Sequence, residues 1–459
     1  MKKGLTDLLS IKSVRISLVL CLITIMMVIP RYAQALKKNG LEADQTSFTQ
    51  NVIKKVYPNG LTLLIKPNYD SDVVALNLLV GIGQLYETPS QKGISSLMQR
   101  CLIYGGTAHR ELYTIYEELE SVGASWGSAA SSDYGTVWSR VTKPGLNKVL
   151  EVFFDIIRNP RFNEGDLETG KGEKIQRVKT LEDQPSNTVF SVFDKCFYGN
   201  HPYSWPVEGS IETISSLKRD DLIEWYRKTY IPNNMVFTVV GNVNPAEIIK
   251  KFEDVFGKMK KGRLPKKSSQ PMPVLEKDIV FHQPQNIQGA YLVLGYPAPS
   301  ARSKDAPVMD LIAVTLSNRL YSELRDKRGL VYHASSSYQT MVGPSAITGI
   351  TVTAPENYSM VRDGIIAEFK KFCDEPVSPL ELQAAKKYCK GIVTMSQGTS
   401  AVQGEIVGAF ELLGYGYKYV DLYPELIEKV TPEDIQRVAR KYFKHYVLAV
   451  VAPEGSVEE

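Results

Sequence analysis

The chain has 459 residues, of which 43% are hydrophobic and 23% charged, and its formal net charge is +4. This length is too great for one ordinary hydrophobic core and predicts two domains of about 200 residues each. The composition is that of a globular protein rather than a disordered or fibrous one. The small net charge, without a basic stripe interleaved with aromatic residues, argues against a nucleic-acid partner.

The N-terminus has the pattern of a secretory signal peptide. Basic residues precede an apolar run over residues 18–29, and Ala33-Gln34-Ala35 follows it. A positive segment, an apolar core and an A-x-A site are the three parts of such a signal. We therefore expect residues 1–35 to be removed on export to the periplasm or another extracytoplasmic compartment. The alternative is an uncleaved anchor, which would bring the chain into contact with the membrane, although a membrane span needs about 20 apolar residues.

The first half of the mature chain combines predicted strands with predicted helices. Segments rich in Val, Ile and Leu predict strands, and amphipathic segments that end at Gly or Asn-Pro predict helices. Strands are predicted at residues 51–57, 61–66, 73–80, 125–130 and 134–141. Helices are predicted at residues 94–102, 112–122, 146–157 and 165–181. Pro58-Asn59-Gly60 has the composition of a hairpin turn between the first two strands.

The second half repeats the first. The segment "GASWGSAASSDYG" is echoed by "LVYHASSSYQTMVG", and "RDDLIEWYRKTYIPNNMVFTVVG" by "PEDIQRVARKYFKHYVLAVVAP". Three aligned pairs have offsets of 206, 215 and 213 residues, namely Gly123 with Gly329, Leu167 with Leu382, and Asp221 with Asp434. Such a near-constant offset indicates an internal duplication.

The duplication predicts an N-terminal domain at residues 50–256 and a C-terminal domain at residues 279–455. Residues 257–278 between them are rich in Lys and contain three prolines, which predicts a polar, semi-extended linker. Helices and strands mix without a steady βαβ rhythm, and hairpin signals are frequent. Each domain is therefore predicted to be α+β, with a mainly antiparallel sheet packed with helices.

Residues 93–107, "GISSLMQRCLIYGGT", resemble the helix that carries the inverted zinc motif H-x-x-E-H in the family of pitrilysin, insulysin and the mitochondrial processing peptidases. The resemblance continues at residues 201–217, 230–243 and 316–338, so it covers nearly the whole mature chain. It implies two homologous domains that face each other as a clamshell.

The zinc motif itself is replaced. In the family, two histidines and a later glutamate bind zinc, and the glutamate beside the second histidine is the general base. In this chain, Ser96 and Arg100 stand at the two histidine positions. Gln99 stands at the position of the general base, and Arg177 at that of the later glutamate. A hydroxyl is a poor zinc ligand, a neutral amide takes no proton from water, and guanidiniums repel a dication. We therefore expect no zinc and no other cofactor in this chain.

The remaining histidines and cysteines do not suggest a substitute metal site. The histidines have no histidine three or four residues away, and no two cysteines form C-x-x-C. The histidines are His109, His201, His282, His333 and His445. The cysteines of the mature chain are Cys101, Cys196, Cys373 and Cys389. We expect structural or surface histidines and free thiols.

The second half, by contrast, keeps two residues that the family uses. The resemblance places an arginine and a tyrosine, seven residues apart, beside the substrate carbonyl, and Arg325 and Tyr332 stand at these positions. A cation and a phenol are suitable donors to the oxygen of a tetrahedral intermediate. The alternative is structural: Arg325 caps or salt-bridges its helix, and Tyr332 packs on the sheet.

Two functions fit a chain that has lost one half-site and kept the other. The first is a non-catalytic subunit, inactive alone, of an exported heterodimeric zinc peptidase. In that pair a sibling chain holds the zinc, and this chain donates Arg325 and Tyr332 to the bound peptide substrate. The second is a peptide-binding or scaffold protein without a part in proteolysis. The lost motif argues against a self-sufficient zinc peptidase.

Overall fold

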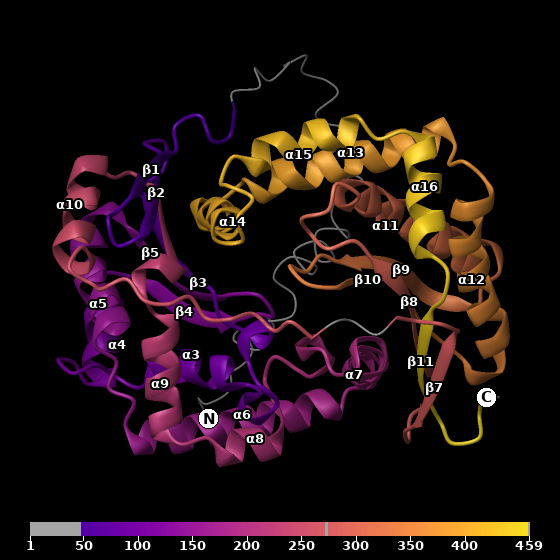
Figure 1. The fold of residues 1–459 in the computed structure, drawn as a ribbon, viewed down its shortest axis with the longest axis horizontal. Helices are drawn as coiled ribbons and strands as arrows, with labels where there is room; N and C mark the ends of the chain where they lie inside the picture. Colours follow the sequence, from indigo (N-terminus) through magenta and orange to yellow (C-terminus); the bar gives the residue numbers. More distant parts are fainter. Residues whose placement is uncertain (1–46, 271–273, 458–459) are drawn as a thin grey trace, which may run out of the picture.

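The computed structural model describes residues 47–270 and 274–457. The predicted signal peptide and its alternative as an anchor lie outside the described residues. The described chain forms two layered halves that face each other, as the sequence predicted for a two-domain α+β clamshell (Figure 1). Within the described ranges, no helix is long and apolar enough to cross a membrane.

The first half is built on a six-stranded sheet in the order β1-β2-β6-β3-β5-β4. Its strands are β1 (Ile53–Val56), β2 (Thr62–Pro67), β3 (Val73–Val80), β4 (Ser125–Ala130), β5 (Gly135–Thr142) and β6 (Met235–Gly241). Only β2 and β6 pair in parallel; the other neighbours are antiparallel. Gly60, at φ 87°, turns the chain from β1 into β2, because glycine adopts this conformation without strain.

Helices cover one face of this sheet and enclose the larger hydrophobic core. They are α3 (Ile94–Tyr104), α4 (Leu112–Glu120), α5 (Leu146–Arg158), α6 (Glu164–Glu182), α8 (Ile211–Ser216), α9 (Arg219–Thr229) and α10 (Pro245–Phe256). Leu76 and Leu78 of β3 pack into this core with Leu97 of α3 and Phe153 of α5. The core therefore fixes α3, which carries three of the replaced motif positions, against the sheet.

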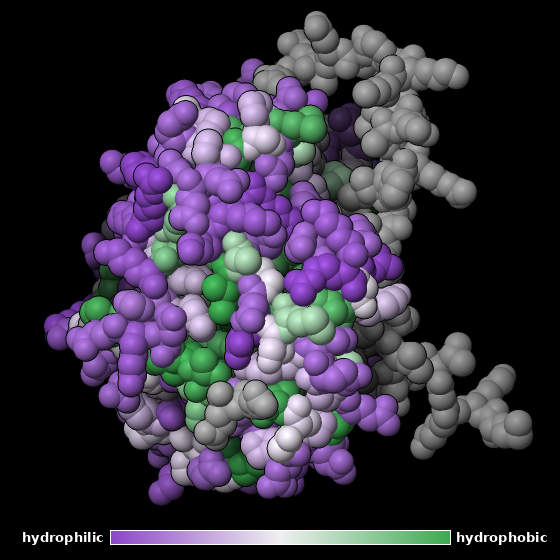
Figure 2. All heavy atoms as spheres, turned by 90° about the vertical axis from the view of Figure 1, so that its right-hand side faces the viewer, coloured by the Kyte–Doolittle hydropathy of each residue, from purple (hydrophilic) through white to green (hydrophobic). Residues whose placement is uncertain are grey.

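The second half is built on a five-stranded sheet in the order β7-β11-β8-β10-β9. Its strands are β7 (Ile279–Pro284), β8 (Ala290–Ala298), β9 (Val331–Gln339), β10 (Ser345–Thr353) and β11 (Val447–Ala452). Its helices are α11 (Ala306–Leu320), α12 (Tyr358–Asp374), α13 (Pro379–Ser396), α15 (Tyr419–Glu428) and α16 (Pro432–Tyr442). The outer face of this half is mostly hydrophilic, with apolar residues between the polar ones (Figure 2).

The two sheets confirm the internal duplication. Apart from β1, the strand order of the second sheet repeats that of the first, and β7 pairs with β11 in parallel as β2 does with β6. Gly123 and Gly329 both have φ near +60° before an edge strand. Asp221 and Asp434 each accept the N-cap backbone N–H at the start of an equivalent helix, α9 or α16.

Two equivalent helices are exchanged between the halves. α7 (Pro185–Tyr198) belongs to the first half by sequence but packs on the second sheet, where Phe193 and Phe197 contact β8 and β11. α14 (Ser400–Leu412) belongs to the second half but packs on β3 and β6 of the first sheet (Figure 1). The halves are therefore interlocked, and the linker separates sequence repeats rather than independent packing units.

Candidate functional site

The start of α3 is held by a buried carboxylate. Glu87 accepts the backbone N–H groups of Gly93 at 2.9 Å and of Ser95 at 3.0 Å, where the helix dipole favours a negative charge. Burial raises the pKa of Glu87 to about 7. Gly93 has φ 85°, and a Cβ there would lie 2.3 Å from the carbonyl oxygen of Glu208. These contacts fix the direction in which α3 presents the replaced motif positions.

Ser96, at the first histidine position, is 5% exposed and hydrogen-bonded to a lysine. Lys174 of α6 donates from Nζ to Ser96 Oγ at 2.6 Å. Burial and the charge of Arg177 lower the pKa of Lys174, whereas the carboxyl of Glu208 raises it. Sequence reasoning missed Lys174 because it considered only the ligand positions. The available signal was its place one helical turn before Arg177.

Gln99, at the position of the general base, is 1% exposed. Its amide faces the buried hydroxyl of Tyr230, and neither group completes a hydrogen bond of normal geometry. A Cβ at Gly135 would approach the Gln99 Nε2 to 2.4 Å, so the amide is tightly enclosed. A neutral amide in this position offers neither a base nor a metal ligand.

The two arginines at ligand positions have different surroundings. Arg100 forms two hydrogen bonds of 2.7 Å to the carboxylate of Glu173 on α6, one from Nε and one from Nη2. This bidentate geometry fixes the guanidinium toward Glu173. Arg177 lies further along α6 and acts on the site through its positive charge near Lys174.

These groups do not fit a zinc ion. Zinc takes nitrogen, sulfur or carboxylate oxygen ligands, whereas the four positions offer a hydroxyl, an amide and two guanidiniums. An additional ammonium, that of Lys174, lies at the first of these positions. Across residues 47–270 and 274–457, no group of three or more His, Cys, Asp or Glu side chains is arranged to hold a metal ion. Cys101, Cys196, Cys373 and Cys389 are free thiols in the structure.

The structure brings Arg325 and Tyr332 side by side. Arg325 lies in a π-helical turn, η7 (Tyr321–Lys327), that continues α11, and Gly329 at φ 62° then turns the chain into β9. Across this turn the Arg325 guanidinium lies 5.6 Å from the Tyr332 ring centroid and 4.8 Å from that of Tyr321. The Tyr332 side chain is 85% exposed, so it does not pack on the sheet. A cation and a phenol are thus available together at the surface.

The replaced motif and the Arg325–Tyr332 pair lie in different halves of the molecule. The replaced positions are on α3 and α6, whereas Arg325 is on η7 and Tyr332 on β9.

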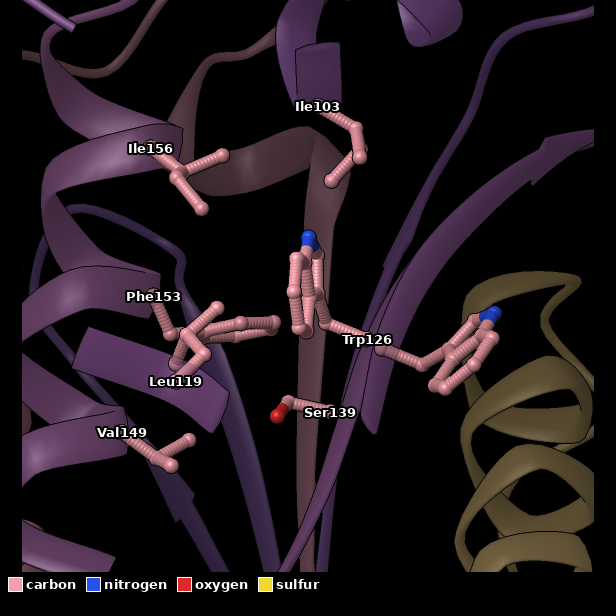
Figure 3. A pocket seen from close by; sticks show the side chains of 8 residues that line it. Ile103, Leu119, Trp126, Ser139, Val149, Phe153 and Ile156 are labelled. Atoms are coloured by element: carbon pink, nitrogen blue, oxygen red, sulfur yellow. The ribbon is translucent and has the colours of Figure 1, made fainter. Parts of the chain in front are cut away.

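A separate narrow space between the first sheet and helices α4 and α5 is lined by large side chains such as Trp126 and Phe153 (Figure 3). This space is too narrow to hold a water molecule and is part of the core. It is not a candidate binding site.

Comparison with known families agrees with this geometry. Residues 62–210 match the family model described as "Insulinase (Peptidase family M16)", and residues 216–389 match the model "Peptidase M16 inactive domain". The chain belongs to the M16 peptidase family. It is a member without the family's zinc ligands at the four replaced positions, and the model that matches residues 216–389 describes an inactive domain.

Similar proteins occur in several bacteria. The "Uncharacterized zinc protease YmxG" of Bacillus subtilis is 25% identical over 87% of this chain and 98% of its own length. An "Uncharacterized zinc protease" of Rickettsia bellii is 24% identical over 86% of this chain and 96% of its own length. A solved structure from Pseudomonas fluorescens, named as a peptidase M16 inactive domain, has a TM-score of 0.82 at 20% identity and covers 89% of this chain and all of its own. The solved structure of a protease from Helicobacter pylori has a TM-score of 0.79 at 19% identity. It covers 88% of this chain and 99% of its own.

Proposed function

We propose that this M16 chain is the non-catalytic subunit of an exported two-chain zinc peptidase. The zinc belongs to a sibling chain with an intact H-x-x-E-H motif, and this chain binds no metal. Arg325 and Tyr332 act in trans on the carbonyl of a peptide bound at the sibling's zinc. Residues 1–35 direct the chain to the periplasm or another extracytoplasmic compartment.

The observation that carries this proposal is the geometry of the Arg325–Tyr332 pair. Tyr332 is 85% exposed and lies beside the Arg325 guanidinium, so it is not part of the hydrophobic core. Both groups are hydrogen-bond donors that can stabilise the negative charge on the oxygen of a tetrahedral intermediate. The replaced motif explains why such donors would act on another chain's metal.

The test uses the complex of this chain with its zinc-bearing sibling and a fluorogenic peptide. We expect Arg325→Ala or Tyr332→Phe to lower kcat by roughly 10²–10³, about 3–4 kcal/mol, because one preorganised donor to the oxyanion is lost. Complex formation, measured by analytical ultracentrifugation, should not change. Arg328→Ala and Tyr113→Phe are matched controls, since both residues are exposed and lie outside the pair.

A scaffold or peptide-binding protein without a part in proteolysis predicts a different result. In that case the variants would assemble with the sibling and turn over peptide at the unmodified rate. Unchanged kcat in a fully assembled Arg325→Ala, Tyr332→Phe double variant would therefore refute the proposed role of the pair.

A further inference from the structure

Two contacts between side chains join α3 to α6 at the replaced motif. One is the 2.6 Å hydrogen bond from Lys174 Nζ to Ser96 Oγ, and the other is the bidentate pair of Arg100 with Glu173. A zinc ion held at the family's ligand positions would join the same two helices, because positions 96 and 100 lie on α3 and position 177 on α6. Protein side chains alone thus make the connection that a metal would make.

A buried carboxyl group, that of Glu208, acts electrostatically on Lys174. Glu208 is 3% exposed, and its Oε2 has no hydrogen-bond partner among the described residues. Burial lowers the pKa of Lys174, whereas the charge of this carboxyl raises it and so favours the ammonium form. A buried carboxylate needs a nearby positive charge, since burial of an unpaired charge is costly. The Lys174 ammonium, hydrogen-bonded to Ser96, is a positive charge from within the chain that interacts electrostatically with this carboxyl.

We propose that the ammonium of Lys174 has replaced the metal ion in this site, both as its positive charge and as the link between α3 and α6. The inference goes beyond the function in trans, because it concerns the chain's own first half. Its consequence is that divalent cations are excluded by repulsion at a distance of a few ångströms, and not only by the lack of ligands. Restoring the four family residues is then insufficient to restore a zinc site.

Metal binding tests the exclusion. One variant carries Ser96→His, Gln99→Glu, Arg100→His and Arg177→Glu; a second adds Lys174→Ala; a matched control adds Lys179→Ala instead. Lys179 is exposed on the same helix, away from Ser96. Zinc affinity is measured by calorimetry, and coordination by the visible spectrum of bound Co²⁺. We expect the Lys174→Ala addition to tighten zinc binding at least about tenfold, and the Lys179→Ala addition to leave it unchanged. Equal affinity of the first two variants would overturn the proposal.

The role of Lys174 in connecting α3 to α6 is tested in the chain without the four restored residues. This experiment still tests the proposal if the restored variants do not fold. Hydrogen exchange reports the opening of α3 and α6. We expect Lys174→Met to increase exchange of amides at the α3–α6 contact at least about tenfold, whereas Lys179→Met and treatment with a chelator leave it unchanged. Unchanged exchange in Lys174→Met, or faster exchange on chelation, would show that Lys174 does not hold the two helices together in place of a metal.

Discussion

The close packing of α14 on the first sheet depends on two glycines, Gly404 and Gly408. The variant Gly404→Ala tests this packing. At Gly404 a Cβ would lie 2.5 Å from Asn77 Nδ2 and 2.7 Å from Thr238 Oγ1. The two side chains are themselves joined by a buried hydrogen bond of 3.0 Å. Gly408, one turn later, approaches the sheet as closely, with a Cβ position 2.4 Å from Leu79 Cδ1. An added methyl group at Gly404 must therefore crowd the contact of α14 with the sheet and break the Asn77–Thr238 bond.

The expected magnitude follows from three contributions. Replacing a helical glycine by alanine gains up to about 1 kcal/mol of helix propensity. Overpacking a tight contact costs about 1–3 kcal/mol. Loss of a buried hydrogen bond costs about 1–3 kcal/mol more. We therefore expect Gly404→Ala to lower the free energy of unfolding by about 3 kcal/mol, with the largest loss of protection in α14.

Urea unfolding followed by circular dichroism measures the total effect, and hydrogen exchange locates it. Gly391→Ala in α13 is the matched control, because a Cβ there meets no atom within 4 Å. That change should raise the free energy of unfolding by up to about 1 kcal/mol. If Gly404→Ala stabilised the protein as Gly391→Ala does, the close packing of α14 on the sheet would be refuted.

Two further predictions concern buried polar groups. Burial lowers the pKa of His201 from its ordinary value of 6.5 to about 4, so the folded protein resists protonation of a group that the unfolded chain protonates. The free energy of unfolding should therefore fall by about 2–3 kcal/mol as the pH drops from 6.5 to 4, which urea unfolding at several pH values measures. His201→Asn should flatten this pH dependence, because asparagine does not titrate but still offers an acceptor for the Tyr203 backbone N–H. Asp133 accepts the Tyr203 hydroxyl and, at 3.0 Å, the backbone N–H of Val342 in the other half. Asp133→Asn should cost about 1–3 kcal/mol in urea unfolding, whereas the exposed Asp70→Asn should cost nothing measurable; equal effects would contradict the contact between the halves.

Much of the fold could be predicted from local patterns in the sequence. The predicted strand at residues 73–80 coincides with β3, and the helix predicted at residues 165–181 is α6 despite its glycines. One of these has a packing reason: at Gly170 a Cβ would lie 3.1 Å from Arg100 Cδ, so this glycine allows α6 to approach α3. The near-constant repeat offsets predicted the duplication because equivalent positions have equivalent backbone roles, as Gly123 and Gly329 do.

Contacts between distant segments could not be predicted in this way. The spacing of Gly404 and Gly408 indicates a helix that packs closely, but it does not say on which sheet. Similarly, the replaced ligand positions predicted the loss of zinc coordination, but not that Lys174 would reach Ser96 from another helix. The resemblance placed Arg325 and Tyr332 together, but local helix signals did not distinguish the π-helical turn that holds Arg325 from an α-helix.

The exchanged helices also determine when the newly made chain can finish folding. The apolar surface of α7, with Phe193 and Phe197, packs against β11, the last strand of the described chain and an inner strand of the second sheet. During synthesis this surface cannot be fully covered until both β8 and β11 have been made. An early product that ends at the linker would expose both α7 and the sheet face that α14 covers. The exchange of α7 and α14 therefore favours one concerted assembly of both halves over folding of the first half alone.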